Sequence, residues 1–264
     1  MKPSPPDSRQ LLTPARQKIW ASLMDPTLKL DEWFWEVHST CTSPRPIAHH
    51  PGSSFLSIEA ATLAEAATYL QEPARHIPQL RWTYDLIREE KPRIRQLTTL
   101  ATMATRAPTG SLQATRLLAD YLFAWSTMLS FGAVINYVLR YFESDSDLWP
   151  AAIEYYNEML ELSGQCERFR PFGAGFMPEG MKAVWAATSD IHSDGRMESL
   201  LRDYETDVKG ANYVDEAKQM KQRLHRVVDR SSREPETQAA SSNGYGDSPE
   251  PADDELAGAQ CVIL

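Results

Sequence analysis

The chain has 264 residues, a formal net charge of −9 and 18 prolines, and 42% of its residues are hydrophobic. This length accommodates one sizeable domain or two small ones. Six of the nine net negative charges belong to residues 231–264, so residues 1–230 are close to neutral. A near-neutral chain lacks the basic surface typical of nucleic-acid binding, and no direct DNA binding is expected.

The cysteine content and the N-terminal composition predict a protein of a reducing compartment. Three cysteines are too few for a disulfide framework or a multi-cysteine zinc site. The first ten residues lack the apolar core of a signal peptide. The predicted location is therefore nuclear or cytoplasmic.

The first half of the chain is expected to form helices separated by proline-rich breaks. Residues 1–12 are rich in proline and serine and are predicted to be disordered. Thr13 and Pro14 provide an N-cap and a first-turn proline for a helix that ends before Asp25. Pro92 is expected to start or kink a helix, and a loop is predicted at 41–54. The other helices are predicted at 30–38, 57–72, 79–90 and 92–107.

The segment 117–139 is the most apolar in the chain, with no charged residue from Tyr121 to Leu139. Its length is close to the roughly 20 residues that span a bilayer, so a transmembrane helix is one interpretation. Polar residues such as Ser130 and Asn136 are spread around this helix, and its flanks carry no excess of Lys or Arg. These features favour the alternative, a central helix buried in a bundle.

The second half continues with helices and contains no convincing strand. Trp149 and Pro150 open a helix over 151–169, and further helices are predicted at 181–190, 198–208 and 213–228. No run alternates apolar and polar residues between hairpin turns. The predicted fold is all-α, a multi-helix bundle around one central apolar helix. It is expected to form a single helical domain at 11–230 with disordered termini, the second being the acidic tail 231–264.

Candidate chemical sites are sparse, and no catalytic residue or cofactor is predicted. His38, Cys41 and His49 are possible zinc ligands, although the adjacent His49 and His50 are poorly placed to reach one ion. The acidic run 143–147 resembles a magnesium-binding cluster, but Asn157 is not followed by the second set of ligands that such enzymes carry. Because phosphate loops and nucleophile motifs are also absent, an all-α enzyme of unrecognised type is only an alternative.

The last four residues, Cys261-Val-Ile-Leu, have the form of a CaaX box whose final leucine indicates geranylgeranylation of Cys261. A geranylgeranyl group would attach the protein to a membrane surface, and a prenylated peripheral membrane protein is therefore an alternative function. The other interpretation is a chance match. Acidic neighbours such as Glu255 would be repelled by anionic lipid.

The segment 213–230 is a basic amphipathic helix with two interpretations. Its apolar residues recur at steps of three and four, as expected for a helix face packed on the bundle. Its basic side chains also suit a partner helix or a membrane surface. These side chains are Lys218, Lys221, Arg223, Arg226 and Arg230.

Three segments of the second half occur in a familiar order: FGAVINYVLRYF at 131–142, CERFRPFGAGFMPEGMKAVWAAT at 166–188 and LLRDYETDV at 200–208. Together they resemble the C-terminal part of the helical regulatory region of fungal-specific zinc-cluster transcription regulators, over about residues 117–208. Those regulators bind DNA through six clustered cysteines, which this sequence lacks. The resemblance implies a non-catalytic regulatory or interaction protein that has protein partners and no zinc cluster of its own.

Overall fold

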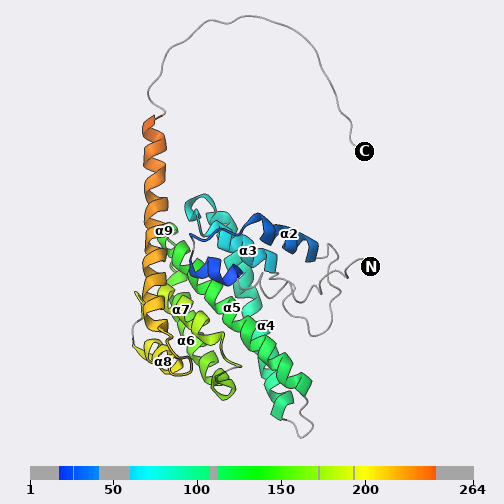
Figure 1. Cartoon of the computed structure of the whole chain (residues 1–264). Helices are drawn as coiled ribbons and strands as arrows, with labels where there is room; N and C mark the ends of the chain where they lie inside the picture. The colour runs from blue at the N-terminus through cyan, green and yellow to red at the C-terminus, as the bar shows by residue number, and fades with distance from the viewer. Residues whose placement is uncertain are drawn as a thin grey trace, which may run out of the picture. The chain divides into compact units, whose positions relative to one another are not determined.

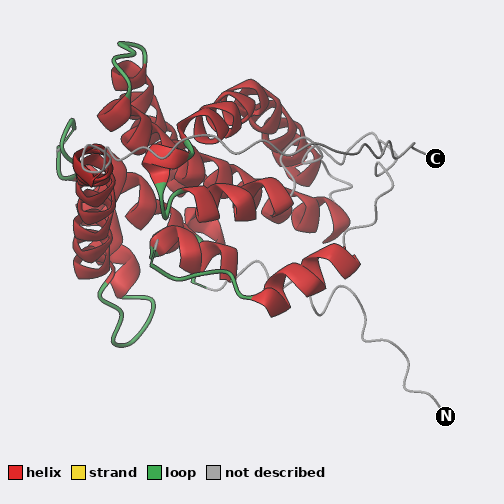
Figure 2. Cartoon of the chain, turned by 90° about the horizontal axis from the view of Figure 1, so that it is seen from above, coloured by secondary structure: helices red, strands yellow, loops and turns green. Residues whose placement is uncertain are grey.

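The computed structural model describes residues 18–25, 27–41, 60–106, 112–171, 173–192 and 194–241, with side chains except at 37–41, 60–61 and 232–241. Within these residues every regular element is a helix and none is a strand, so the all-α prediction is confirmed (Figure 2). The chain divides into two compact units, Met1–Ser232 and Arg233–Leu264, and the structure below is that of the first.

Figure 1 shows how the described helices are arranged. A first helical segment covers residues 18–24. The elements after it are α2 (Glu32–Cys41), α3 (Ala60–Tyr69), the 3-10 helix η1 (Pro73–Arg75), α4 (Ile77–Arg106), α5 (Leu112–Phe142), α6 (Leu148–Cys166), the 3-10 helix η2 (Glu167–Phe169), α7 (Met177–Thr188), α8 (Arg196–Glu205) and α9 (Tyr213–Ser241).

The apolar helix α5 is the centre of the bundle and contacts α4, α6 and α7. Among the described helices it alone is long and apolar enough to cross a membrane, but 89% of its most apolar window is buried inside the protein. Burial by neighbouring helices explains why the helix lacks a polar face. The interpretation of residues 117–139 as a bundle core therefore agrees with the structure.

Helix α4 differs from the expectation, because one continuous helix replaces the two that were predicted on either side of Pro92. An internal proline removes one backbone hydrogen bond and costs a few kcal/mol. Here Pro92 is exposed, so the carbonyl it leaves unpaired lies on the solvent side, whereas Ile87 and Ile94 are buried. Packing of α4 against α5 on both sides of the proline outweighs the local preference for a break.

A buried polar network connects four helices around Asn136 of α5. The Asn136 Nδ2 donates to the Tyr84 hydroxyl of α4 and to the Leu148 carbonyl of α6, both at 2.9 Å. Arg140 Nε donates to Asn136 Oδ1 at 2.9 Å, and an Arg140 terminal nitrogen donates to the Ala187 carbonyl of α7 at 2.6 Å. A buried polar group that loses its partner destabilises the fold, so α4, α6 and α7 must keep the register on α5 that maintains these hydrogen bonds.

The connection from α6 to α7 is held to α8 by Arg170. Its Nε donates to Asp207 Oδ2 at 2.7 Å, and a second nitrogen donates to the carbonyl of Asp203 at 3.0 Å. The guanidinium lies 4.1 Å from the centre of the Tyr204 ring. The planar guanidinium of Arg170 thus forms hydrogen bonds along its edge and stacks on an aromatic ring with its face, which a lysine ammonium could not do.

Candidate functional site

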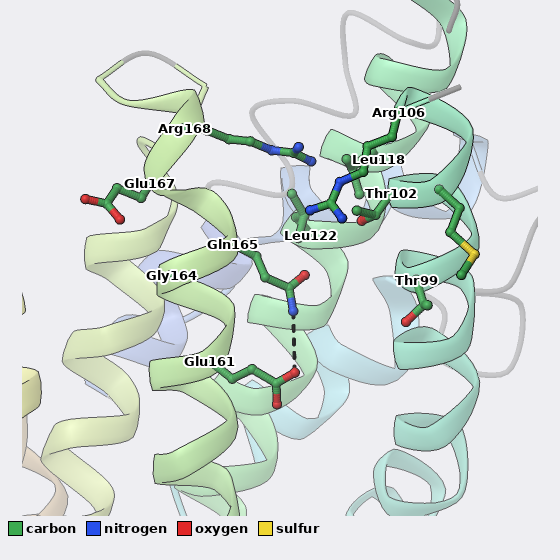
Figure 3. A pocket seen from close by; sticks show the side chains of 11 residues that line it. Thr99, Thr102, Arg106, Leu118, Leu122, Glu161, Gly164, Gln165, Glu167 and Arg168 are labelled. Atoms are coloured by element: carbon green, nitrogen blue, oxygen red, sulfur yellow. Dashed lines mark hydrogen bonds between the residues drawn. The ribbon is translucent and has the colours of Figure 1, made fainter. Parts of the chain in front are cut away.

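A groove lies between the C-terminal parts of α4 and α6, with the first turns of α5 as its floor (Figure 3). Its volume is about 710 Å³, within the range of ligand-binding clefts. Leu118 and Leu122 of α5 are buried and make the floor apolar. The walls come from α4 and from α6 with η2, and they consist of Thr99, Thr102, Met103, Arg106, Glu161, Gly164, Gln165, Glu167 and Arg168.

An ion pair closes one end of the groove. Arg95 of α4 lies 3.1 Å from the Glu161 carboxylate of α6, and its guanidinium is 5.8 Å from the centre of the buried Trp125 ring. Gln165 Nε2 donates to Glu161 Oε1 at 3.5 Å. Beyond this ion pair, toward the C-terminal ends of α4 and α6, the described side chains of the two helices form no further hydrogen bond or ion pair with each other, and the residues that line the groove continue to Arg106 and Arg168.

Two arginines face each other at the open end. Figure 3 shows the side chains of Arg106 and Arg168 extending toward one another, while the Glu167 carboxylate extends away from them. Both arginines are exposed, and neither has a carboxylate within 4 Å among the residues that the structure describes. Elsewhere, arginines such as Arg81, Arg95 and Arg170 are paired with acidic groups. The two guanidinium groups at the mouth therefore have no ion-pair partner among the described residues, and that of Arg168 lies 4.7 Å from the centre of the Phe169 ring.

Met103, which lines the groove, is 64% exposed. Leu100 on the same end of α4 is 55% exposed, and Leu112 and Leu117 on the first turns of α5 are 69% and 42% exposed. The groove thus combines an apolar floor, the exposed Met103 side chain on one wall and two arginines without an ion-pair partner among the described residues.

The basic helix predicted at 213–230 is the first part of α9, and most of its charge is already engaged within the chain. Lys218 lies 3.5 Å from Asp215, Lys221 lies 2.5 Å from Asp190, and Arg223 lies 3.6 Å from Asp25. Its apolar face is buried against the bundle at Val214, Ala217, Met220, Leu224 and Val228. Arg226 and Arg230 stay exposed, and these two alone offer little charge for a membrane surface.

The side chains of the predicted metal and lipidation residues are not among those that the structure describes. His38 and Cys41 are backbone positions of α2 without described side chains, and His49 and Cys261 lie outside the described residues. The described part of the chain holds no group of three His, Cys, Asp or Glu side chains that could bind a metal.

Two of the three acidic residues in the run 143–147 are paired with an arginine. Arg81 of α4 lies 2.5 Å from Glu143 and 2.6 Å from Asp145. The hydrogen bond from Arg81 is the largest cause that lowers the pKa of Asp145. The two carboxylates therefore serve as a link between α4 and the turn that precedes α6.

A chain of polar groups joins α5 to α9. The Tyr137 hydroxyl is 2.8 Å from His225 Nδ1, and His225 Nε2 is 3.5 Å from Asp190. This order resembles a catalytic relay, but burial raises the pKa of Tyr137 and keeps the phenol protonated. A protonated, buried phenol is a hydrogen-bond donor rather than a nucleophile, so the contact serves the packing of α9.

The loop before α8 is organised by Asp194. This carboxylate accepts hydrogen bonds from the Tyr156 hydroxyl, from the Arg196 side chain and, at 3.0 Å, from the Arg196 backbone nitrogen. The Tyr156 bond is the largest cause that holds the pKa of Asp194 well below its ordinary value of 3.8. Burial raises the pKa of Tyr156 to about 12, so this hydroxyl stays a donor at neutral pH.

These bonds predict a pH-dependent contribution to stability. Because the pKa of Asp194 is lower in the folded state, its contribution is present above pH 4 and is lost as the pH falls toward the folded-state value. Asp194→Asn should therefore lower the free energy of unfolding at pH 7, with a smaller difference from wild type at pH 3. Urea denaturation followed by circular dichroism at both pH values measures this. An equal difference at both pH values would contradict it, and Asp120→Asn, at an exposed position of α5, is the control.

The groove residues Arg106 and Arg168 were not predicted from the sequence. They lie far apart in the chain, and only the packing of α4 and α6 on α5 places them opposite each other. Comparisons with known proteins add no assignment: no family model, no curated protein and no solved structure matches this chain.

Proposed function

We propose that this protein is a non-catalytic regulatory protein that acts through protein contacts. The groove between α4 and α6 carries the proposal, because it combines exposed apolar side chains with two cations that lack acidic partners among the described residues. Protein interaction surfaces are enriched in arginine and methionine in this way. The Glu161 carboxylate in this groove is paired with Arg95, which supports a role in the structure of the groove.

The contacts between the segments that resemble fungal zinc-cluster regulators support the same proposal. Arg140 of the first segment donates to the Ala187 carbonyl of the second. Arg170 of the second segment is paired with Asp203 and Asp207 of the third. The quoted motifs are thus parts of one packed unit, as expected of a regulatory module. Without a cysteine cluster, such a module needs a partner to reach DNA.

A tethering experiment tests the regulatory role. The full chain is fused to an unrelated sequence-specific DNA-binding domain and directed to a promoter that controls a reporter gene. We expect reporter transcription to change, and the double variant Arg106→Glu/Arg168→Glu to lose the effect. The matched control Arg93→Glu/Arg116→Glu reverses two exposed arginines that do not line the groove and should retain it. A wild-type fusion that occupies the promoter without changing transcription would contradict the proposal.

The second candidate is a prenylated peripheral membrane protein attached through Cys261. The sequence Cys261-Val-Ile-Leu favours it, and a geranylgeranyl chain gives reversible membrane binding. The intact mass of the native protein decides this, because modification adds the prenyl group and removes the last three residues. Cys261→Ser should then be lost from the membrane fraction. An unmodified mass ending at Leu264 would reject the anchor.

An all-α enzyme is the remaining alternative. Turnover of a substrate that persists in the Arg106 and Arg168 variants would support an enzyme whose active site lies outside the groove.

A further inference from the structure

We infer that the groove between α4 and α6 binds an acidic amphipathic helix of a partner protein. The inference rests on the proposed function and specifies its partner class. The groove is formed by helices, and the described residues contain no strand that an extended peptide could pair with. Helix backbones are already hydrogen-bonded internally, so recognition depends on side chains, which favours a helix laid into a groove.

The apolar part of the groove fits one face of a short helix. Leu118 and Leu122 form a floor with helical spacing, and Met103 extends the apolar surface along the rim. From Thr99 to Arg106 the wall rises by about 10 Å, which is roughly two helical turns. A helix with leucine-like residues at positions i, i+3, i+4 and i+7 presents a complementary stripe. The unbranched Met103 can adapt to different side chains.

The charged part of the groove specifies an acidic partner. Arg106 and Arg168 face each other at the mouth and pair with no described carboxylate (Figure 3). Guanidinium groups form bidentate, charge-assisted hydrogen bonds with carboxylates. Glutamates on the outer face of a bound helix would lie beside these arginines, because the apolar face points to the floor.

Two other classes of ligand agree less well with the surface. A nucleic acid requires many phosphate contacts along an extended basic surface, whereas residues 1–230 are close to neutral. A small molecule confined to the cavity would occupy only part of the wall from Thr99 to Arg106, whereas a partner helix extends along this wall to the arginines at the mouth.

A synthetic peptide tests the inference directly. The probe is a fluorescein-labelled helical peptide of about 14 residues with leucines on one face and glutamates on the other, titrated with the full chain in a fluorescence anisotropy assay. We expect saturable binding that weakens as sodium chloride is raised, because the arginine contacts are screened. Arg106→Glu/Arg168→Glu should weaken binding at least about tenfold, or about 1.4 kcal/mol. Met103→Glu should also weaken it.

Controls separate the groove from general charge and from misfolding. Arg93→Glu/Arg116→Glu has the same change in net charge and should bind within about twofold of wild type. A peptide of equal composition with its leucines scattered around the helix should bind at least about tenfold more weakly. Circular dichroism confirms that each variant is folded, and all substituted side chains are exposed.

Several results would overturn the inference. These are no saturable binding, equal binding of the scrambled peptide, and equal binding by the double arginine variant. A dimer of the full chain that dissociates when Arg106 and Arg168 are reversed would assign the groove to a second copy instead. If the reporter responds but the peptide does not bind, the inference about the groove is rejected and the proposed function stands. If the peptide binds but the reporter does not respond, the transcriptional role is rejected and the inference about the groove stands.

Discussion

Asn136→Leu is expected to lower the free energy of unfolding by about 3 kcal/mol. Leucine has the same branching and the same number of side-chain heavy atoms and is larger than asparagine, so the loss comes mainly from hydrogen bonds and not from a cavity. The substitution removes the partner of the Tyr84 hydroxyl, of the Leu148 carbonyl and of Arg140 Nε. Each buried group left unpaired costs about 1–3 kcal/mol, and partial rehydration of Arg140 keeps the total near the lower end of the combined range. Chemical denaturation followed by circular dichroism measures the change.

Two further variants show whether the network is the cause. Asn157→Leu makes the same replacement at an exposed position of α6 and should change stability by no more than about 0.5 kcal/mol. Tyr84→Phe removes one member of the network and should cost about 1 kcal/mol alone, but less when combined with Asn136→Leu. Full additivity of the two substitutions, or a loss below about 1 kcal/mol for Asn136→Leu, would show that the network contributes little.

Gly180→Ala is expected to destabilise the protein by about 2 kcal/mol, within the usual range for overpacking a core. Gly180 lies where α7 crosses α5, and a Cβ there would be 2.2 Å from Ser126 Oγ and 3.2 Å from Met159 Cε. Both α5 and α7 are fixed by neighbouring helices, so they cannot separate freely. The denaturation midpoint should fall without a change in slope, since the unfolded state exposes the same surface.

A second substitution should relieve this clash. Ser126 Oγ is buried and has no hydrogen-bond partner, so Ser126→Ala alone is expected to be neutral or stabilising. It also removes the atom nearest to the added methyl group, and Gly180→Ala should cost less in the Ser126→Ala background. Gly164→Ala on α6 is the control, because a Cβ at this position would meet no described atom within 4 Å. This substitution should raise the free energy of unfolding by about 0.5–1 kcal/mol through helix propensity. Failure of Ser126→Ala to restore stability would place the strain elsewhere.

The sequence alone determined the fold class and the position of the central helix. Helical spacing of apolar residues is a local property, and it predicted α6 and the buried face of α9. The uncharged run from Tyr121 to Leu139 required burial on all sides, which α5 has. The sequence did not decide whether lipid or protein surrounds this helix, because a bilayer and a protein core both require an apolar composition.

Tertiary structure decided what depends on contacts between distant segments. The continuity of α4 through Pro92 follows from burial of Ile87 and Ile94 against α5, a gain that local propensity does not include. Two of the partners of Asn136 come from α4 and α6, so its polarity was visible in the sequence but its role was not. Arg106 ends α4 and Arg168 lies in η2, and neither carries a local signal of function. They form one positively charged mouth because α4 and α6 pack on α5 in the registration that buried side chains impose.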